Sequence, residues 1–145
     1  MDPSINEIVC PIDNEWKFKK YDLIAANNFE DGHMGGKHFY AFNIHGVSYK
    51  VDIFSTVRSG FTSIYFIVNG SKERKVTGDL TASIESSDYS KKLNTDLQEC
   101  NNIFFEYNVD FFESKLFVNG EITVRVKGTL KAQRPSVTVS YILML

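Results

Sequence analysis

The sequence predicts an all-β fold, an antiparallel β-sandwich of about seven to eight strands. Apolar and polar residues alternate with a period of two in several segments, which is typical of strands with one buried face. Pairs such as Asn-Gly and His-Gly separate these segments and suit tight turns. No segment shows the 3.6-residue period of an amphipathic helix. A closed β-barrel is the alternative architecture.

The composition indicates one globular domain. The chain has 145 residues, enough to bury a sizeable core, and its 12 Phe and 7 Tyr favour strands over helices. A net charge of −2 gives no basic surface, so we expect no nucleic-acid partner. No run reaches the length of a membrane span and the N-terminus lacks a signal-peptide pattern, so we expect a cytoplasmic or nuclear protein that does not contact membranes.

Three parts are expected along the chain: a flexible N-terminal arm over residues 1–15, a sandwich over 16–131 and an apolar tail or extra strand over 132–145. The arm is polar and broken by two prolines. Residues 16–24 are expected to form the first strand, and the glycine-rich residues 25–37 a loop.

The central prediction is a hairpin over residues 40–53. Alternating residues flank His45-Gly46, and glycine supplies the positive φ that a two-residue turn needs. A third strand follows over residues 61–68. Because it is apolar on both faces, we expect it inside a sheet that packs on another layer.

The second half of the chain continues the strand pattern. Residues 76–84 alternate cleanly, and Gly78 within them indicates a bulge or a close approach of another segment. A surface loop is expected over 86–98. Further expected elements are a strand over 103–107, a short helical turn or irregular packing over 109–118, an Asn119-Gly120 turn, and a strand over 122–130.

No catalytic or metal-binding motif is found. The segment from Gly32 to His38 lacks the spacing of a phosphate-binding loop, and no nucleophile elbow occurs. The three histidines, His33, His38 and His45, have no metal-ligand spacing. We therefore expect a protein that is not an enzyme and that uses no cofactor or metal.

Six aromatic residues lie within fourteen positions and allow two interpretations. The simpler one places them in the core. The other places one or two of them in a peptide-binding groove, because aromatic residues dominate binding hot spots. The six residues are Phe104, Phe105, Tyr107, Phe111, Phe112 and Phe117.

Four segments together resemble the MATH domain (meprin and TRAF homology), in the divergent form that nematode-type proteins often link to a BTB domain. The segment FNIHGVSYKVDI at 42–53 is similar to the family's second-strand hairpin, and GFTSIYFIVN at 60–69 resembles its strand with a Ser and a Tyr. The segment FVNGEITVRVKGTLK at 117–131 is similar to its closing strand, and WKFKKYDL at 16–23 looks like its first strand.

This resemblance implies an eight-stranded sandwich that binds extended peptide segments of protein partners. In BTB-linked relatives it implies the substrate-recognition part of a cullin-based ubiquitin ligase. Tyr65 matches a groove tyrosine, and Leu80 and Ala82 lie near a groove-lining position. Phe111 and Phe112 are the nearest counterparts of the Asp-Trp-Gly-Phe stretch that the family usually has and this chain lacks.

Two other hypotheses come from the residues alone. The first is a carrier of small hydrophobic ligands, with the aromatic residues lining the interior of a β-barrel. The second is self-association into a homo-oligomer through the uncharged residues 136–145, because an apolar edge strand invites pairing with another copy.

Overall fold

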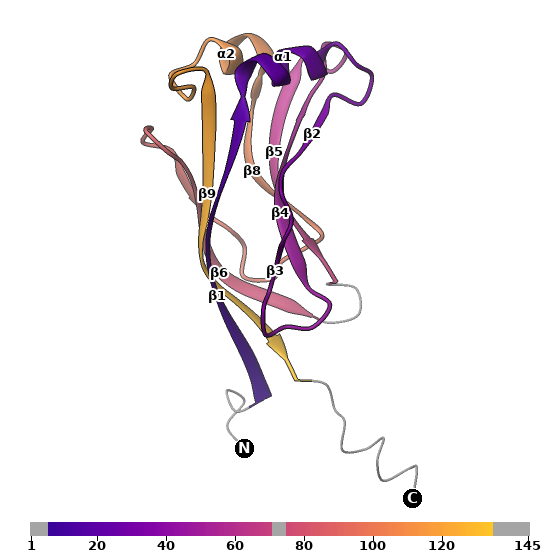
Figure 1. Cartoon of the computed structure of the whole chain (residues 1–145), viewed down its shortest axis with the longest axis vertical. Coiled ribbons are helices and arrows are strands. Elements are labelled where there is room, and N and C mark those ends of the chain that lie inside the picture. The colour runs from indigo at the N-terminus through magenta and orange to yellow at the C-terminus, as the bar shows by residue number, and fades with distance from the viewer. Residues whose placement is uncertain (1–5, 71–74, 135–145) are drawn as a thin grey trace, which may run out of the picture.

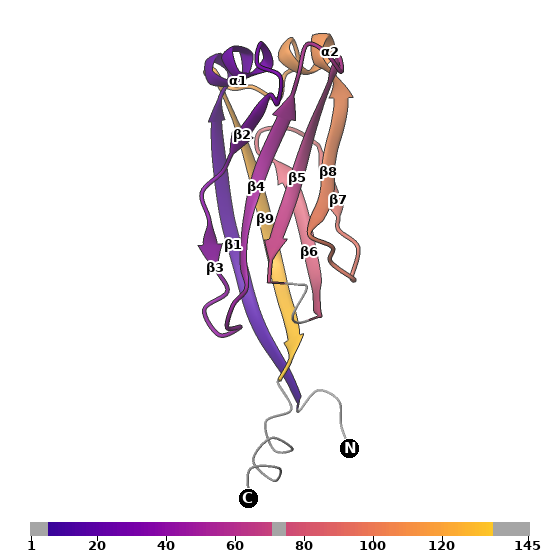
Figure 2. The same ribbon diagram turned by 90° about the vertical axis from the view of Figure 1, so that its right-hand side faces the viewer.

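The computed structural model describes residues 6–70 and 75–134, which form two antiparallel sheets packed face to face (Figures 1 and 2). The first sheet has the order β1 (Glu7–Lys19), β9 (Glu121–Gln133), β6 (Val76–Ile84) and β7 (Ser90–Lys92). The second has the order β2 (His33–Gly35), β4 (Ser48–Ser55), β5 (Phe61–Asn69) and β8 (Cys100–Tyr107), with β3 (Phe39–Tyr40) also paired to β4. The described strands do not close into a barrel, so the sandwich prediction is confirmed.

Two short helices cover one end of the sandwich. They are α1 (Lys20–Asn27), which follows β1 directly, and α2 (Asn108–Phe112), which follows β8 directly (Figures 1 and 2). Among the described residues, no helix is long and apolar enough to span a membrane.

The core lies between the sheets and is rich in aromatic side chains. Trp16 of β1 makes edge-to-face contacts with Tyr49 of β4 and Phe66 of β5, at ring distances of 6.2 and 6.5 Å. Such contacts add to the free energy gained from burying the rings. Strand β9 fits this packing because every second side chain from Ile122 to Ala132 points into the core. The exception is position 128, which is a glycine.

The first strand begins earlier than the sequence indicates. Residues 7–15, expected as part of a flexible arm, form the first part of β1 and pair with β9 from Glu7↔Gln133 onward. Cys10 and Ile12 are buried in the core, and Pro11 is accommodated because β1 is an edge strand. Residues 20–24, expected as strand, belong to α1. Residues 135–145 lie outside the described part of the chain.

The expected hairpin exists, but its turn is longer than predicted. Strands β3 and β4 pair with Tyr40 opposite Ser48, so residues 41–47 connect them instead of His45-Gly46 alone. This connection packs inward through Ala41, Ile44 and Val47, which are buried. Gly46 does adopt the expected positive φ of 81°.

Most later elements match the sequence prediction. Strand β6 has the predicted bounds, and Leu97 approaches Gly78 so closely that a Cβ there would lie 3.0 Å from its methyl group. The Asn119-Gly120 turn has positive φ at both residues. The expected loops at 25–37 and 86–98 each include a short strand, β2 and β7 respectively.

Candidate functional site

An aromatic surface covers the outer face of the second sheet. Because opposite residues in a sheet share a face, the register that places Phe54 opposite Ser63 and Ser63 opposite Phe105 sets all three on this side. Residues two positions away from these three along their strands have side chains on the same face of the sheet. We call this surface the outer aromatic face and define it by Phe54 of β4, Phe61 and Tyr65 of β5, and Phe105 and Tyr107 of β8.

The rings of this face form two groups of contacts. Phe61 stacks on Phe105 and lies against Tyr107, each at a centroid distance of 4.8 Å. Phe54 contacts Tyr65 edge-to-face at 5.7 Å. Ser63 lies in the row between Phe54 and Phe105 and is nearly buried by its neighbours. The result is a shallow apolar strip that crosses β4, β5 and β8.

Part of this strip is open to solvent. Phe105 is 57% exposed and Tyr107 is 59% exposed, while Phe54, Phe61 and Tyr65 are partly exposed. Single exposed aromatic residues are common on protein surfaces, but a contiguous group of them on one sheet face is typical of a binding surface. The outer aromatic face is therefore a candidate binding surface.

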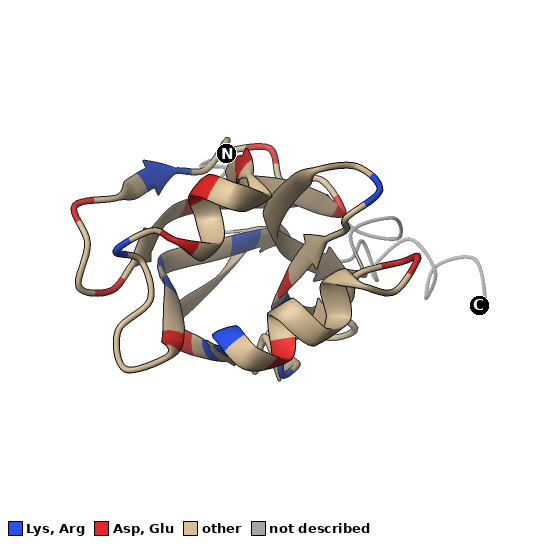
Figure 3. Cartoon of the chain, turned by 90° about the horizontal axis from the view of Figure 1, so that it is seen from above, with Lys and Arg blue, Asp and Glu red and all other residues tan. Residues whose placement is uncertain are grey.

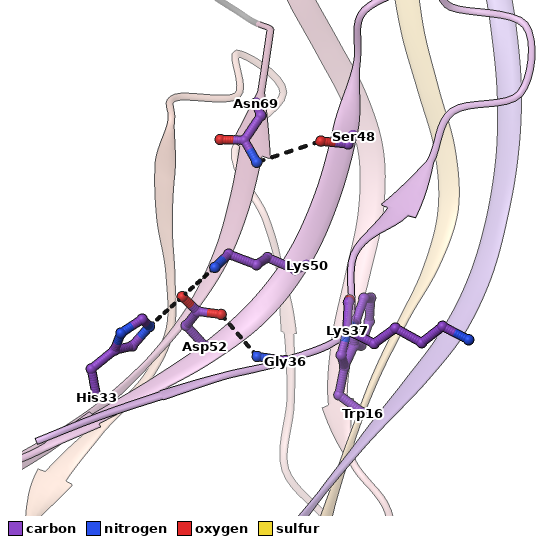
Figure 4. A network of polar contacts seen from close by, with 8 residues as sticks. All are labelled: Trp16, His33, Gly36, Lys37, Ser48, Lys50, Asp52 and Asn69. Carbon is purple, nitrogen blue, oxygen red and sulfur yellow. Dashed lines mark hydrogen bonds and ion pairs between the residues drawn. The ribbon is translucent and has the colours of Figure 1, made fainter.

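A buried carboxylate lies beside this surface (Figure 4). Asp52 of β4 is only 1% exposed, and its Oδ2 lies 2.7 Å from Nε2 of His33 and 3.0 Å from Nζ of Lys50. Its Oδ1 accepts a hydrogen bond of 3.0 Å from the backbone N–H of Gly36. These three donors compensate for the cost of removing a carboxylate from water.

The Asp52 contacts hold the segment after β2 against the sheet. The indole N–H of Trp16 donates a 2.7 Å hydrogen bond to the carbonyl of Lys37 from the other side (Figure 4). Between these two anchors, a Cβ on Gly36 would lie 2.1 Å from the Val51 carbonyl oxygen. The backbone therefore approaches β4 at a distance that only glycine permits.

Strand β8 is an edge strand of the second sheet, and side chains cover part of its backbone. The carbonyl of Asn102 accepts from Lys91 Nζ at 3.0 Å, and that of Ile103 accepts from the Tyr89 hydroxyl. The Asn102 amide donates to the Phe104 carbonyl at 3.3 Å. These contacts occupy carbonyls in the middle of β8. In its second half the Tyr107 N–H donates to Glu106 Oε1 at 2.9 Å, an exposed contact, so the backbone around Phe105 is the more accessible part for another chain.

Two other polar pairs are structural. The Tyr49 hydroxyl donates to Asn14 Oδ1 at 2.6 Å, and burial, together with the nearby Cys10, raises the pKa of Tyr49 to about 12. Arg125 and Asp13 form a two-point contact at 2.7 Å, which lowers the pKa of Asp13. The second pair lies on the outside of the first sheet, away from the outer aromatic face.

The five residues that the resemblance implies for a groove do not come together. Tyr65 lies on the outer aromatic face, as a binding role requires. Leu80 and Ala82 point inward from β6 of the other sheet, and both are fully buried. Phe111 is likewise a core residue, and Phe112 is partly buried against it at a ring distance of 5.2 Å. Of the five, only Tyr65 lies on the outer aromatic face.

The aromatic cluster in the sequence is divided between the core and the surface. Phe104, Phe111, Phe112 and Phe117 pack in or against the core, whereas Phe105 and Tyr107 point outward. Phe54 and Phe61 were not recognised as surface residues. A signal was present for Phe61, because it lies four positions before Tyr65 in the same strand and hence on the same face.

The described part of the chain contains no group of three or more metal-ligating side chains that could hold a metal ion. His33 pairs with Asp52, while His38 and His45 are exposed in other segments. The two cysteines, Cys10 and Cys100, are free thiols.

Comparison of the sequence with models of known protein families finds no match, and comparison with curated protein sequences finds no match either.

Proposed function

We propose that the chain is a non-enzymatic interaction module that binds an extended peptide segment of a partner protein on its outer aromatic face. The single observation that supports this proposal most is the exposure of Phe105 and Tyr107 beside Phe61 and Tyr65 on one sheet face. The resemblance of residues 16–131 to the MATH domain points to the same class of ligand.

The geometry suits an extended ligand better than a globular one. A peptide that runs along β8 gains main-chain hydrogen bonds from the accessible part of this edge and places alternate side chains against the rings. Apolar side chains that meet Phe105 and Tyr107 are expected at two of these positions. A contact of this size gives a dissociation constant on the order of micromolar, about −8 kcal/mol.

The ligase setting is a narrower proposal and rests on the resemblance alone. In that setting the chain recognises a protein destined for ubiquitin transfer, and a BTB protein connects it to a cullin. Self-association or a BTB dimer would raise the apparent affinity through avidity.

A peptide-display selection tests the proposed function. The immobilised chain is offered a library of random twelve-residue peptides, and enriched sequences are remeasured as synthetic peptides by fluorescence anisotropy. We expect enriched peptides with a shared apolar pattern and affinities near micromolar. The variants Phe105→Ala and Tyr65→Ala should weaken them at least tenfold, because each removes a ring that the peptide contacts.

The matched control is Tyr21→Ala. Tyr21 of α1 is 82% exposed and lies outside the outer aromatic face. Its ring can make nonspecific apolar contacts as readily as the tested rings. The proposal is supported by peptides that bind Tyr21→Ala and the unchanged chain with equal affinity but bind Phe105→Ala more weakly. A selection with no enriched peptide, or equal losses in all three variants, contradicts it.

A further inference from the structure

A second surface feature lies at the helical end of the sandwich, away from the outer aromatic face. It is a pocket of about 490 Å³ between α1 and α2. Its volume falls within the range of sites for small organic molecules, about 300–1,000 Å³, and exceeds what one side chain fills. Ile24, Val57, Val109 and Phe112 form apolar walls.

The walls are unusually exposed for aliphatic residues. Ile24 is 45% exposed, Val57 66% and Val109 71%, and they come from three segments that are distant in sequence. Grouped exposed apolar residues around a concavity are a mark of ligand binding.

The polar groups of the pocket are arranged by a chain of hydrogen bonds beneath it. The amide nitrogen of Asn108 donates to the Thr56 carbonyl at 2.7 Å, and its Oδ1 lies 2.7 Å from the Thr62 hydroxyl and 3.2 Å from the Ser55 hydroxyl, which are themselves 2.9 Å apart. The Ser55 oxygen in turn accepts from the amide nitrogen of Asn27 at 2.6 Å. When the Ser55 hydroxyl donates to Asn108, the Asn27 amide turns its nitrogen rather than its oxygen to Ser55.

Two amide oxygens in the pocket lining accept no hydrogen bond from a described residue. Asn27 is only 8% exposed and lines the pocket, and its Oδ1 has no hydrogen-bond partner among the described residues. The neighbouring Asn28, also in the lining, directs its amide nitrogen to the Ile24 carbonyl at 3.5 Å, which leaves its oxygen free in the same way. No buried side-chain nitrogen or oxygen among the described residues lacks a partner, so the Asn27 oxygen is accessible at the pocket surface, where the donor of a ligand can reach it.

The pocket lining itself contains one charge, and it is negative. Glu113 is the one charged residue in the lining, and no described residue forms an ion pair with it. Arg58, which follows the lining residue Val57, forms an ion pair with Glu30, with 3.3 Å between its guanidinium nitrogen and Oε1 of Glu30. Figure 3 views the molecule from this end, where α1 and α2 each have an acidic residue in the first turn, Asp22 and Asp110, and α1 also begins with the basic Lys20.

We propose that the pocket binds a small organic cation, a compact apolar body with one protonated amine. The body fills the space between the apolar walls, and the ammonium donates to Asn27 Oδ1 with Glu113 at the rim. This inference concerns a different surface from the proposed peptide site and does not depend on it.

Three compounds with one body and different head groups test the proposal. They are 4-phenylbutylamine, 4-phenylbutanol and 4-phenylbutanoate, titrated into the ¹⁵N-labelled chain while amide shifts are recorded. We expect saturable shifts at α1, α2 and residues 57–60, with the amine binding tightest, the alcohol weaker and the carboxylate not detectably. Glu113→Gln should weaken the binding of the amine about two- to fivefold and leave that of the alcohol unchanged, because a solvent-exposed charge at the rim adds only a weak attraction.

Lysine substitutions at the rim provide the second arm. Val109→Lys and Val57→Lys each place a cation at the pocket and should abolish amine binding, while Val9→Lys, the same change on β1 far from the helices, should not (Figure 1). A dispersed amide spectrum shows that a variant is folded. Two rim variants are used so that the test still works if one of them does not fold. Equal binding of all three compounds, shifts located elsewhere, or no shifts would overturn the proposal.

Discussion

Nε2 of His33 lies 2.7 Å from Oδ2 of Asp52, a carboxylate that is almost completely buried on the outer face of its own sheet. The His33 ring also stacks on Phe54 at a centroid distance of 4.5 Å. Through these two contacts the edge strand β2 is attached to β4, directly beside the outer aromatic face. The polar network and the aromatic surface are therefore parts of one arrangement.

The substitution Asp52→Asn should destabilise the fold by about 3 kcal/mol. The amide keeps one acceptor for Gly36 but presents its NH₂ group to His33 and Lys50, both of which are donors in the native contacts, and a broken buried pair is costly. Urea unfolding measures the change. The control is Asp79→Asn, whose 3.5 Å ion pair with Lys92 is exposed and should contribute less than about 0.5 kcal/mol. Equal effects would show that the Asp52 network does not stabilise the sheet.

Gly36→Ala should be strongly destabilising, whereas Gly35→Ala should be close to neutral. A Cβ at position 36 would lie 2.1 Å from the Val51 carbonyl and 2.7 Å from Cδ1 of Trp16, while one at position 35 meets nothing nearer than 3.7 Å. Overpacking of this kind costs about 1–3 kcal/mol or more. Thermal unfolding of the two adjacent variants gives the comparison, and a similar melting temperature for both would contradict the close approach.

Phe111→Ala should cost about 3–5 kcal/mol in unfolding free energy, because the ring is fully buried and leaves a cavity. Phe105→Ala should cost little, because much of that ring is already in water. The two residues come from the same aromatic cluster in the sequence, so the pair tests the division into core and surface. A large loss of stability in Phe105→Ala would make it a core residue and remove it from the binding surface.

The stability of the fold should fall at alkaline pH through Tyr49. The pKa of Tyr49 is about 12 in the folded chain, compared with ~10 in an unfolded one. Burial is the larger cause of this increase, and the nearby Cys10 is the smaller one. The folded state therefore favours the protonated hydroxyl, and this contribution is complete below pH ~10 and is lost as the pH rises toward 12. Unfolding free energies measured between pH 8 and 11 should decline less in Tyr49→Phe than in the unchanged chain. Tyr21→Phe, at an exposed ring, is the control, and identical declines in all three would contradict the assignment.

Local alternation was sufficient to predict the strands whose inward face is strictly apolar. Strand β6 has its predicted bounds because every second residue from Val76 to Ile84 points to the core. The first half of β1 was missed because Pro11 and several polar residues conceal its alternation, and because its strand conformation depends on pairing with β9, more than 100 residues later. Pairing at such distance is not visible in a local window.

The binding surface was only partly predictable for a similar reason. Tyr65 was found through the resemblance, and its strand parity also places Phe61 on the same face. Phe54 joins them through the register between β4 and β5, and Phe105 through a register between β5 and β8 that shifts at Ile64/Tyr65. The resemblance places Leu80 and Ala82 near a groove-lining position, but both point inward because the first sheet packs on the second.

The most direct test of the central proposal is an amide-shift map of the ¹⁵N-labelled chain with a peptide obtained by selection. The proposal predicts saturable shifts along β5 and the second half of β8, centred on Phe105 and Tyr107, and their loss in Phe105→Ala with the fold intact. Shifts confined to the helical end or to the first sheet would contradict it, because the peptide would then bind without the outer aromatic face.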